Sequence, residues 1–345
     1  MSSFHAGNGL RIVSSVIAGL DPAIHPLRKK YVFRSRWTRG SSPRVTRGCP
    51  RMTTEIRDCL PPVRDTRKPE VVLPAGSIDT HVHVFERRYR LSPGRGYNPP
   101  ESKLDDLKRL HSILGIDRVV FTQPSVYGTD NSAILDGMAA LNAETPKRAR
   151  CVVAISMEVS EQELARFDTL GVRGVRLNTD NKGGMPIALG NISELASRIA
   201  PFGWHLEFLF PGKEILDLMP VFGALKVPIS IGHFAYQLAA AGVAAPGFKA
   251  LVELIRRGNT WVKISGANRV SASDLPPYDD VKPMAQALVE AAPERIMWGT
   301  DWPHPNKYVV NPNDGDLVDA FGDWITDHAL RHKIMVETPA KFYRF

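Results

Sequence analysis

The stretch GSIDTHVHVF (residues 76–85) decides the fold prediction, because it has the features of a short buried strand that ends in two histidines, His81 and His83. Side chains at positions i and i+2 of a strand point to the same face, so both imidazoles are expected to converge on one spot. Near the other end of the chain, RIMWGTDWPHPN (295–306) has similar features and ends in Asp301. We therefore predict that these two stretches are the first and last strands of a closed parallel barrel and meet in space.

Between these two ends, short apolar runs alternate with longer segments whose apolar residues recur every three or four positions, as in amphipathic helices. The runs are apolar throughout, which is typical of parallel strands that are covered by helices. The eight runs lie at 78–85, 118–123, 151–156, 173–178, 205–210, 227–233, 260–265 and 295–300. Eight such units over roughly 270 residues predict a single α/β domain, a TIM-like (β/α)8 barrel. The alternative is a doubly wound open sheet, but HVHVFERRYRLSPG stands where that fold usually has a glycine-rich phosphate loop.

Composition divides the 345 residues into three parts. Residues 1–51 hold ten Lys and Arg but one acid, Asp21, a net charge of +9, which leaves about −1 for the rest of a chain whose total is +8. We predict a disordered basic leader over 1–51, an extended proline-rich arm over 52–76 and the barrel over 77–345. The abrupt change at Met52 favours an upstream extension with Met52 as the true start. A targeting presequence and a tail that binds nucleic acid or membrane are the alternatives.

The same numbers exclude several classes of function. A barrel of nearly neutral charge gives no case for nucleic-acid binding, and no apolar run approaches the roughly 18–20 residues of a membrane helix. The three cysteines, Cys49, Cys59 and Cys151, form no disulfide or metal-binding pattern, which favours a reducing compartment and a cytoplasmic location. The expected partner is a small molecule, and the oligomeric state stays open.

Polar residues gather where the predicted strands end, which is where TIM barrels place their active sites. A histidine pair in the pattern HxH together with Asp301 is harder to explain as structural than a lone histidine. Arg176 lies in an otherwise apolar strand, so it requires a carboxylate from the protein or from a ligand. His205 starts its strand and is expected to be structural. The candidates at the strand ends are His81, His83, Gln123, Ser125, Tyr127, Arg176, Asn178, His233, Ser265, Arg269, Asp301 and His304.

Five motifs in the same order and spacing resemble the amidohydrolase superfamily (amidohydrolase-related, family 2), namely DTHVHVF, QPSVYGTDN, GVRGVRLN, FGWHL and WGTDWPHPN. The resemblance runs from about Gly76 to Tyr343 and points to the branch that contains 2-pyrone-4,6-dicarboxylate lactonase and galactarolactone isomerase. It implies a hydrolase that opens a cyclic ester with Asp301 as the general base on water. It also implies that His81, His83 and His233 polarise the lactone carbonyl without a divalent metal, and that Arg176 and Arg269 hold carboxylates.

The residues at the strand ends argue against a binuclear metal site. A binuclear site would need a bridging carboxylate or modified lysine on the fourth strand and a histidine at the end of the fifth. The fourth strand instead ends in Arg176 and Asn178, the fifth ends in Phe210 and Pro211, and a cation beside Arg176 would be repelled. We therefore predict no cofactor. A single zinc ion is the alternative, with ligands of suitable type in His81, His83, His233 and Asp301.

The sequence also departs from the dicarboxylate lactonase pattern. In GHFAYQ (232–237), Tyr236 stands where an arginine is expected, and Lys182 stands where a second one is expected after Asn178. A tyrosine cannot form the bidentate charged contact that an arginine makes with a carboxylate. The substrate is therefore expected to carry fewer or differently placed carboxylates. The residues expected to bind or enclose it are Arg176, Arg269, Lys182, Ser125, Tyr127, Tyr97, Asn178 and His304.

The prediction from these observations is a hydrolase that opens a lactone of a small carboxylated compound. Asp301 would accept a proton from water, while His81, His83 and His233 would stabilise the carbonyl oxyanion as donors. The alternatives are a zinc-dependent hydrolase or decarboxylase and a lactone isomerase that moves the acyl group without consuming water. A non-catalytic barrel is disfavoured because the polar cluster is complete.

Overall fold

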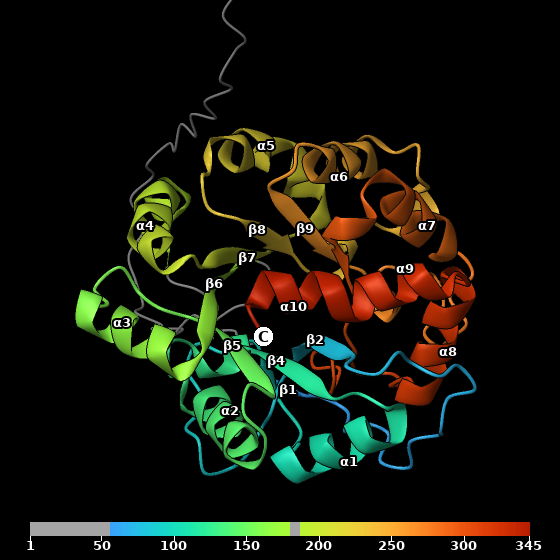
Figure 1. The fold of residues 1–345 in the computed structure, drawn as a ribbon, viewed down its shortest axis with the longest axis horizontal. Coiled ribbons are helices and arrows are strands. Elements are labelled where there is room, and N and C mark those ends of the chain that lie inside the picture. The colour runs from blue at the N-terminus through green and yellow to red at the C-terminus, as the bar shows by residue number, and fades with distance from the viewer. Residues whose placement is uncertain (1–55, 180–186) are drawn as a thin grey trace, which may run out of the picture. The chain divides into compact units, whose positions relative to one another are not determined.

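A computed structural model of the chain describes residues 56–179 and 187–345 (Figure 1), so the predicted leader over 1–51 and Lys182 lie outside the described residues. The segment that follows Ile56 begins with β1 (Arg57–Asp58), which pairs in parallel with β3 (Tyr97–Asn98). Further along the same segment, Arg67 forms ion pairs with Asp316 and Asp319 of a helix near the C-terminus. These contacts hold the segment against the outside of the barrel.

The central sheet contains eight parallel strands within the described part of the chain, which confirms the predicted fold. Each strand falls within or overlaps one of the eight apolar runs, so burial on both faces explains why the sequence could reveal them. In sequence order the strands are β2 (Ile78–Val82), β4 (Arg118–Thr122), β5 (Ala149–Val153), β6 (Val172–Asn178), β7 (His205–Leu209), β8 (Ile229–Ile231), β9 (Thr260–Lys263) and β10 (Ile296–Met297). Each strand pairs with its neighbours in this order.

Backbone hydrogen bonds between β2 and the segment after β10 close the sheet into a barrel. Thr80 N–H donates to the carbonyl of Trp298 at 3.2 Å, and Asp301 N–H donates to the carbonyl of His81 at 2.9 Å. His83 N–H extends the same series to Trp302 at 2.9 Å. The first and last strands therefore meet as predicted, and this contact sets Asp301 directly beside the two histidines.

Helices follow the strands and cover the outside of the barrel, as Figure 1 shows. Their buried residues recur at three-four spacing, which is why the sequence predicted them. No helix in the described ranges is long and apolar enough to cross a membrane. The helices are α1 (Leu104–Leu114), α2 (Ser132–Glu144), α3 (Glu161–Leu170), α4 (Ile192–Ile199), α5 (Ile215–Ala224), α6 (Pro246–Arg256), α7 (Lys282–Ala291), α8 (Asp314–Trp324), α9 (His328–His332) and α10 (Thr338–Tyr343).

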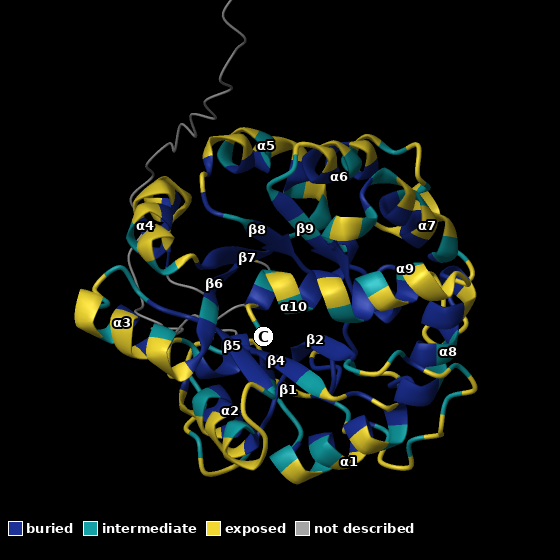
Figure 2. Ribbon diagram, in the orientation of Figure 1, coloured by how far each residue is buried: buried dark blue, intermediate teal, exposed yellow. Residues whose placement is uncertain are grey.

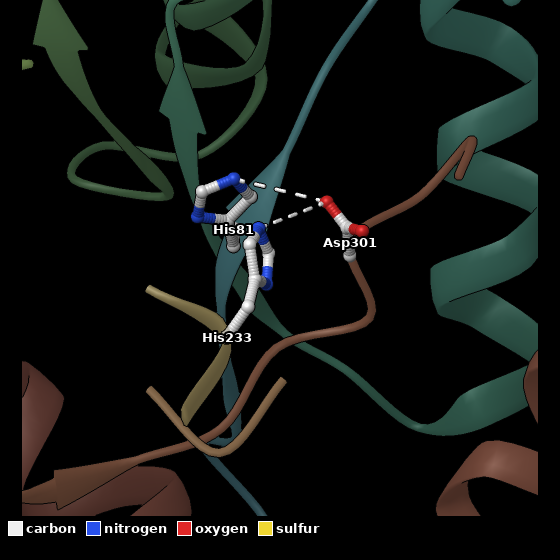
Figure 3. Close-up of side chains that lie close together, drawn as sticks. All are labelled: His81, His233 and Asp301. Atoms are coloured by element: carbon white, nitrogen blue, oxygen red, sulfur yellow. Dashed lines mark ion pairs between the residues drawn. The ribbon is translucent and has the colours of Figure 1, made fainter. Parts of the chain in front are cut away.

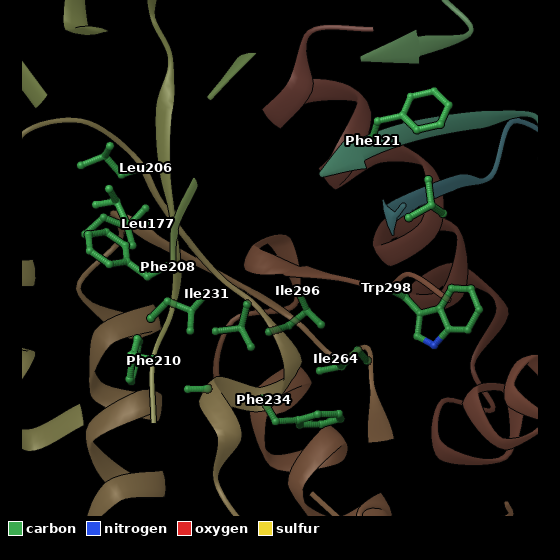
Figure 4. Close-up of a cluster of buried hydrophobic side chains, with 14 of the residues drawn as sticks. Phe121, Leu177, Leu206, Phe208, Phe210, Ile231, Phe234, Ile264, Ile296 and Trp298 are labelled. Carbon is green, nitrogen blue, oxygen red and sulfur yellow. The ribbon is translucent and has the colours of Figure 1, made fainter. Parts of the chain in front are cut away.

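The main hydrophobic core lies between the strands and these helices, with exposed residues on the outer helix faces (Figure 2). Figure 4 shows part of it, including Phe208 of β7, Ile231 of β8 and Ile264, which directly follows β9. These side chains are at most 4% exposed, so each stabilises the fold by roughly 1.5–3 kcal/mol.

The amino-terminal end of the barrel is filled by apolar side chains and closed by the C-terminal helix. Tyr343 of α10 packs in a separate buried cluster whose other members come from the strands, namely Ile78, Val120, Val152 and Met297. Arg150 donates to the carbonyl of Arg344 at 2.7 Å and so holds the chain end in place. His205 lies here, with its ring 4.5 Å from that of Phe342. A small molecule can therefore reach the barrel interior at the opposite, carboxyl end.

Candidate active site

A bulge in β2 aims His81 into the barrel. Between Asp79 and Val82, β2 contains one residue more than the paired stretch of β4, where Val119 and Phe121 are the partners. Such an extra residue shifts the alternation of faces. Asp79 accordingly contacts His111 of α1, on the outside, and also accepts hydrogen bonds from Thr300 N at 3.0 Å and Thr300 Oγ1 at 2.6 Å. Asp79 therefore fixes the backbone immediately before Asp301.

His233 is placed by a left-handed turn, His233–Tyr236, that follows β8. All four residues have φ between 52° and 55°, a conformation that costs energy for residues other than glycine. The neighbouring loop supports the turn. Gln237 Nε2 donates to the carbonyls of Gly212 at 2.8 Å and Ala235 at 3.1 Å, and a Cβ at Gly212 would overlap the carbonyl oxygen of Tyr236. Close packing therefore holds the turn in this conformation.

One carboxylate oxygen of Asp301 faces three imidazoles. Its Oδ1 lies 3.6 Å from Nε2 of His233, 3.8 Å from Nε2 of His81 and 3.9 Å from Nε2 of His83, and Figure 3 shows the first two of these pairs. Among the described residues Oδ1 has no hydrogen-bond partner. The other oxygen, Oδ2, accepts a hydrogen bond from Arg269 Nε at 2.6 Å. The carboxylate is thus fixed on one side and unsatisfied on the side that faces the imidazoles.

Burial determines the charge state of this cluster. Burial lowers the pKa of His81, His83 and His233 well below the ordinary value, and the charges of Lys263 and Arg176 lower it further. Arg269 lowers the pKa of His83 and His233 as well. These three imidazoles are therefore neutral near pH 7. Burial raises the pKa of the Asp301 carboxyl, while Arg269 opposes that shift. A carboxylate with a raised pKa is a stronger base than an exposed aspartate.

Hydrogen-bond partners assign the proton on two of the three neutral imidazoles. His83 Nδ1 lies 2.7 Å from the carbonyl of Thr122, which can only accept, so Nδ1 carries the proton and Nε2 a lone pair. His81 Nδ1 lies 3.3 Å from Nζ of Lys263, whose ammonium can only donate, so the proton of His81 sits on Nε2. His233 Nδ1 contacts the hydroxyl of Ser265 at 3.0 Å, and a hydroxyl permits either arrangement.

A buried ion pair that sequence reasoning missed lies beneath His81. Glu207 on β7 and Lys263 on β9 are at most 1% exposed, and Lys263 Nζ lies 2.5 Å from Glu207 Oε2. Arg176 on β6 is the register partner of Glu207, and its Nε lies 3.9 Å from Glu207 Oε1. The protein therefore supplies a carboxylate for Arg176. Charged residues within two apolar strands, HLEFL (205–209) and TWVK (260–263), were the signal that could have revealed the pair.

A small pocket opens above this cluster and collects most of the predicted site residues. Four of its lining residues were not predicted as site residues, namely Leu209, Tyr236, Pro305 and Asn306. Tyr236 stands where an arginine was expected. Arg269 also donates to the carbonyl of Pro305 at 3.0 Å, so its contacts here are with the protein. The predicted residues that line the pocket are His83, Tyr97, Ser125, Arg176, Asn178, His233, Arg269 and Asp301.

Two of the remaining candidates lie to the side of this pocket. Tyr127 lines a neighbouring cavity with Phe85, and its hydroxyl accepts a hydrogen bond from Glu86 N at 3.2 Å. His304 Nε2 contacts Asp314 of α8 at 3.1 Å, and both side chains are buried. Neither contact directs the side chain toward Asp301. Both residues therefore have a structural partner on the wall around the site.

The distances within the cluster would allow a metal ion, but the hydrogen bonds of its residues do not. Ligand atoms of His81, His233 and Asp301 all lie within 4.8 Å of one another, a spacing that could hold a cation. However, Lys263 donates to Nδ1 of His81, so the imidazole proton is on Nε2. A metal would need a lone pair at that nitrogen. The charges of Lys263 and Arg269 would also repel a dication. In this hydrogen-bonded state the residues do not fit a metal.

Comparison with known proteins places this geometry in a family. The profile of the amidohydrolase family matches residues 78–345, which include all eight strands of the barrel. The chain belongs to the amidohydrolase family. The resemblance inferred from the five motifs is therefore confirmed. Family membership alone specifies neither the substrate nor the metal content of the site.

Three similar proteins within this family illustrate its range. A 4-sulfomuconolactone hydrolase from Hydrogenophaga intermedia is 35% identical, over 83% of this chain and 94% of that protein. A D-galactarolactone isomerase from Agrobacterium fabrum is 31% identical, over 80% of this chain and 94% of its own length. A solved structure from Pseudomonas putida, described as a 2-pyrone-4,6-dicarboxylic acid hydrolase, is 32% identical with a TM-score of 0.68, and the match covers 79% of this chain and 98% of that one.

Proposed function

We propose that this chain hydrolyses the lactone of a small anionic compound at the Asp301 centre, without a metal. The observation that carries the proposal is the unsatisfied Oδ1 of Asp301, which faces three neutral imidazoles at the mouth of the barrel. A buried base beside donors and acceptors of known orientation is what proton removal from water requires. Relatives named as hydrolases of anionic lactones support the substrate class.

In the proposed reaction, Oδ1 of Asp301 removes a proton from water as the water oxygen attacks the lactone carbonyl. Nε2–H of His81 donates to the oxyanion that forms, and a donor placed before the reaction begins needs no reorganisation. The ring C–O bond then breaks and the released oxygen takes the proton from Asp301, which gives a hydroxyl and a carboxylic acid. The acid carries the second proton of the water and releases it to the solvent as it ionises to the carboxylate. His83 carries a lone pair on Nε2, so we propose that it orients the water as an acceptor, in place of the donor role expected from the sequence.

Substrate charge would be matched by the arginines of the pocket. Arg176 lines the pocket, its Nη1 donates to the carbonyl of Gln123 at 2.8 Å, and its Nε faces Glu207 at 3.9 Å. The guanidinium has further N–H donors that a carboxylate or sulfonate oxygen of the substrate could accept from. We propose Arg176 as the principal anion contact, with Arg269 held against Asp301 to control the base.

A lactone panel in water enriched in oxygen-18 tests this proposal. Hydrolysis puts one labelled oxygen into the new carboxylate, and we expect turnover that is unchanged after dialysis against a chelator. The D-galactarolactone isomerase among the relatives supports one second candidate, intramolecular acyl migration, which would yield an isomeric lactone without label. Loss of activity on chelation, restored by zinc, would contradict the metal-free proposal. Mass spectrometry of the product distinguishes the two reactions.

Substitution of Arg269 is expected to shift the pH dependence of the reaction. Burial raises the pKa of Asp301 and Arg269 opposes this shift, so Arg269→Gln should raise the pKa further. Less carboxylate is then present at each acidic pH, and the acid limb of the kcat/KM profile moves to higher pH. Arg269→Lys keeps a positive charge and should move the limb less. A limb that stays in place in Arg269→Gln would show that Asp301 does not control it.

A further inference from the structure

We infer that Lys263 is the positioning residue that makes this centre a metal-free one, and that removing its ammonium group would turn His81 into a metal ligand. The inference deepens the proposed function, since it concerns the same His81. The side chain of Lys263 is 0% exposed and lies inside the barrel.

The ammonium group of Lys263 has three N–H donors, and three acceptors surround it. They are the carbonyl of Thr80 at 2.8 Å, Glu207 Oε2 at 2.5 Å and His81 Nδ1 at 3.3 Å. The carbonyl and the carboxylate can only accept, so the remaining donor points at Nδ1. This arrangement requires a lone pair on Nδ1 and hence a proton on Nε2 of His81.

Glu207 would impose the opposite arrangement if the lysine were absent. Its Oε1 lies 3.6 Å from His81 Nδ1 and has no hydrogen-bond partner within the described ranges. A carboxylate in that position accepts a hydrogen bond from Nδ1–H, which leaves the lone pair on Nε2. A carboxylate behind a histidine is the arrangement that orients and strengthens histidine ligands of metal ions. The lysine thus determines which of two chemistries the same imidazole can perform.

Two side chains close to Nε2 of His81 could also act as metal ligands. Oδ1 of Asp301 has no hydrogen-bond partner among the described residues, and Nδ1 of His233 contacts a hydroxyl that allows a lone pair on Nε2. Ligand atoms of His81, His233 and Asp301 lie within 4.8 Å of one another, so a change at His81 would complete a set of two imidazoles and one carboxylate. Metal–ligand bonds of about 2.0–2.2 Å place tetrahedral ligand atoms roughly 3.4 Å apart, so these side chains would move closer together on binding. Loss of the ammonium charge would also reduce the repulsion of a dication.

Titration with Co²⁺ tests the inference on the whole chain, without substrate. Lys263→Met should bind one equivalent about 10–100-fold more tightly than the wild type, with the visible absorption of a four-coordinate site. Lys263→Arg keeps a cation behind His81 and should bind as weakly as the wild type. The double variant Lys263→Met, His81→Gln should bind Co²⁺ as weakly as the wild type. Equal affinity in the wild type and Lys263→Met would overturn the inference.

A second measurement on the unaltered protein decides the matter even if Lys263→Met does not fold. Nitrogen-15 NMR of histidine-labelled protein distinguishes protonated from unprotonated ring nitrogens, and the spectrum of His81→Gln identifies the signals of His81. We expect a proton on Nε2 and none on Nδ1 near neutral pH. A proton on Nδ1 would overturn the inference. Because neither measurement uses a lactone, failure here is distinguishable from failure of the proposed hydrolysis.

Discussion

Asp301→Asn is expected to lower kcat about a thousandfold on any lactone that the wild type opens, because general base catalysis contributes roughly 10²–10⁴. The amide has nearly the shape of the carboxylate but cannot take a proton from water. The arrangement of His81, His83 and His233 around it should persist. Steady-state rates on the same lactone, with circular dichroism to confirm folding, measure the effect.

A matched control uses another aspartate that is hydrogen-bonded but remote from the mouth. Asp168 of α3 accepts from Trp204 Nε1 at 2.8 Å, and an asparagine can still accept that bond. Asp168→Asn is expected to keep kcat within about twofold of the wild type. If Asp301→Asn turns over lactone at a rate near that of Asp168→Asn, Asp301 is not the base.

The protein is expected to lose stability on mild acidification. Burial lowers the pKa of His81, His83 and His233 well below the ordinary 6.5 and that of His205 to about 3. The unfolded chain therefore binds more protons below about pH 6.5, so this stability is complete above that pH and is lost as the pH falls. At pH 5.5, each histidine that stays neutral in the folded protein lowers the free energy of unfolding by about 1.4 kcal/mol relative to neutral pH. Asp301 acts in the opposite sense because its pKa is raised.

Urea unfolding at pH 7.5 and pH 5.5 measures this effect. The four histidines together are expected to contribute about 5 kcal/mol to the difference in the free energy of unfolding, before the opposing effect of Asp301. His205 provides the matched control, because it lies at the end of the barrel away from Asp301. In His205→Gln the difference between the two pH values should shrink by about 1.4 kcal/mol. Equal stability at both pH values in the wild type would mean that the histidines are charged in the folded state.

The barrel could be predicted from the sequence because its strands are buried on both faces. In β5 (Ala149–Val153), for example, the run Cys151–Val153 is apolar and fully buried on both faces of the sheet. The histidines and Asp301 could be found because carboxyl ends of parallel strands meet at one mouth. The bulge in β2 was not predictable, since an extra residue in a strand leaves no mark in its apolar pattern.

The layer beneath the histidines was missed for a different reason. The requirement that a buried charge has a partner was applied to Arg176 but not to Glu207 or Lys263, although each lies in an apolar strand. Pairing of residues two strands apart depends on the register and curvature of the barrel, which the sequence does not state. The role of His83 depends in the same way on the carbonyl of Thr122, a backbone contact that no side-chain pattern reveals.

The hydrogen bonds that close the barrel also place Asp301 beside the histidines, so the site is complete only when the barrel closes. Thr80 and Trp298 are separated by 218 residues, so their contact is among the most non-local in the chain. Contacts of this kind form late, because the intervening chain must first become compact. A chain folded only as far as β9 would hold all three imidazoles but not Asp301. If Asp301 is the base that we propose, activity arises only on completion of the ring.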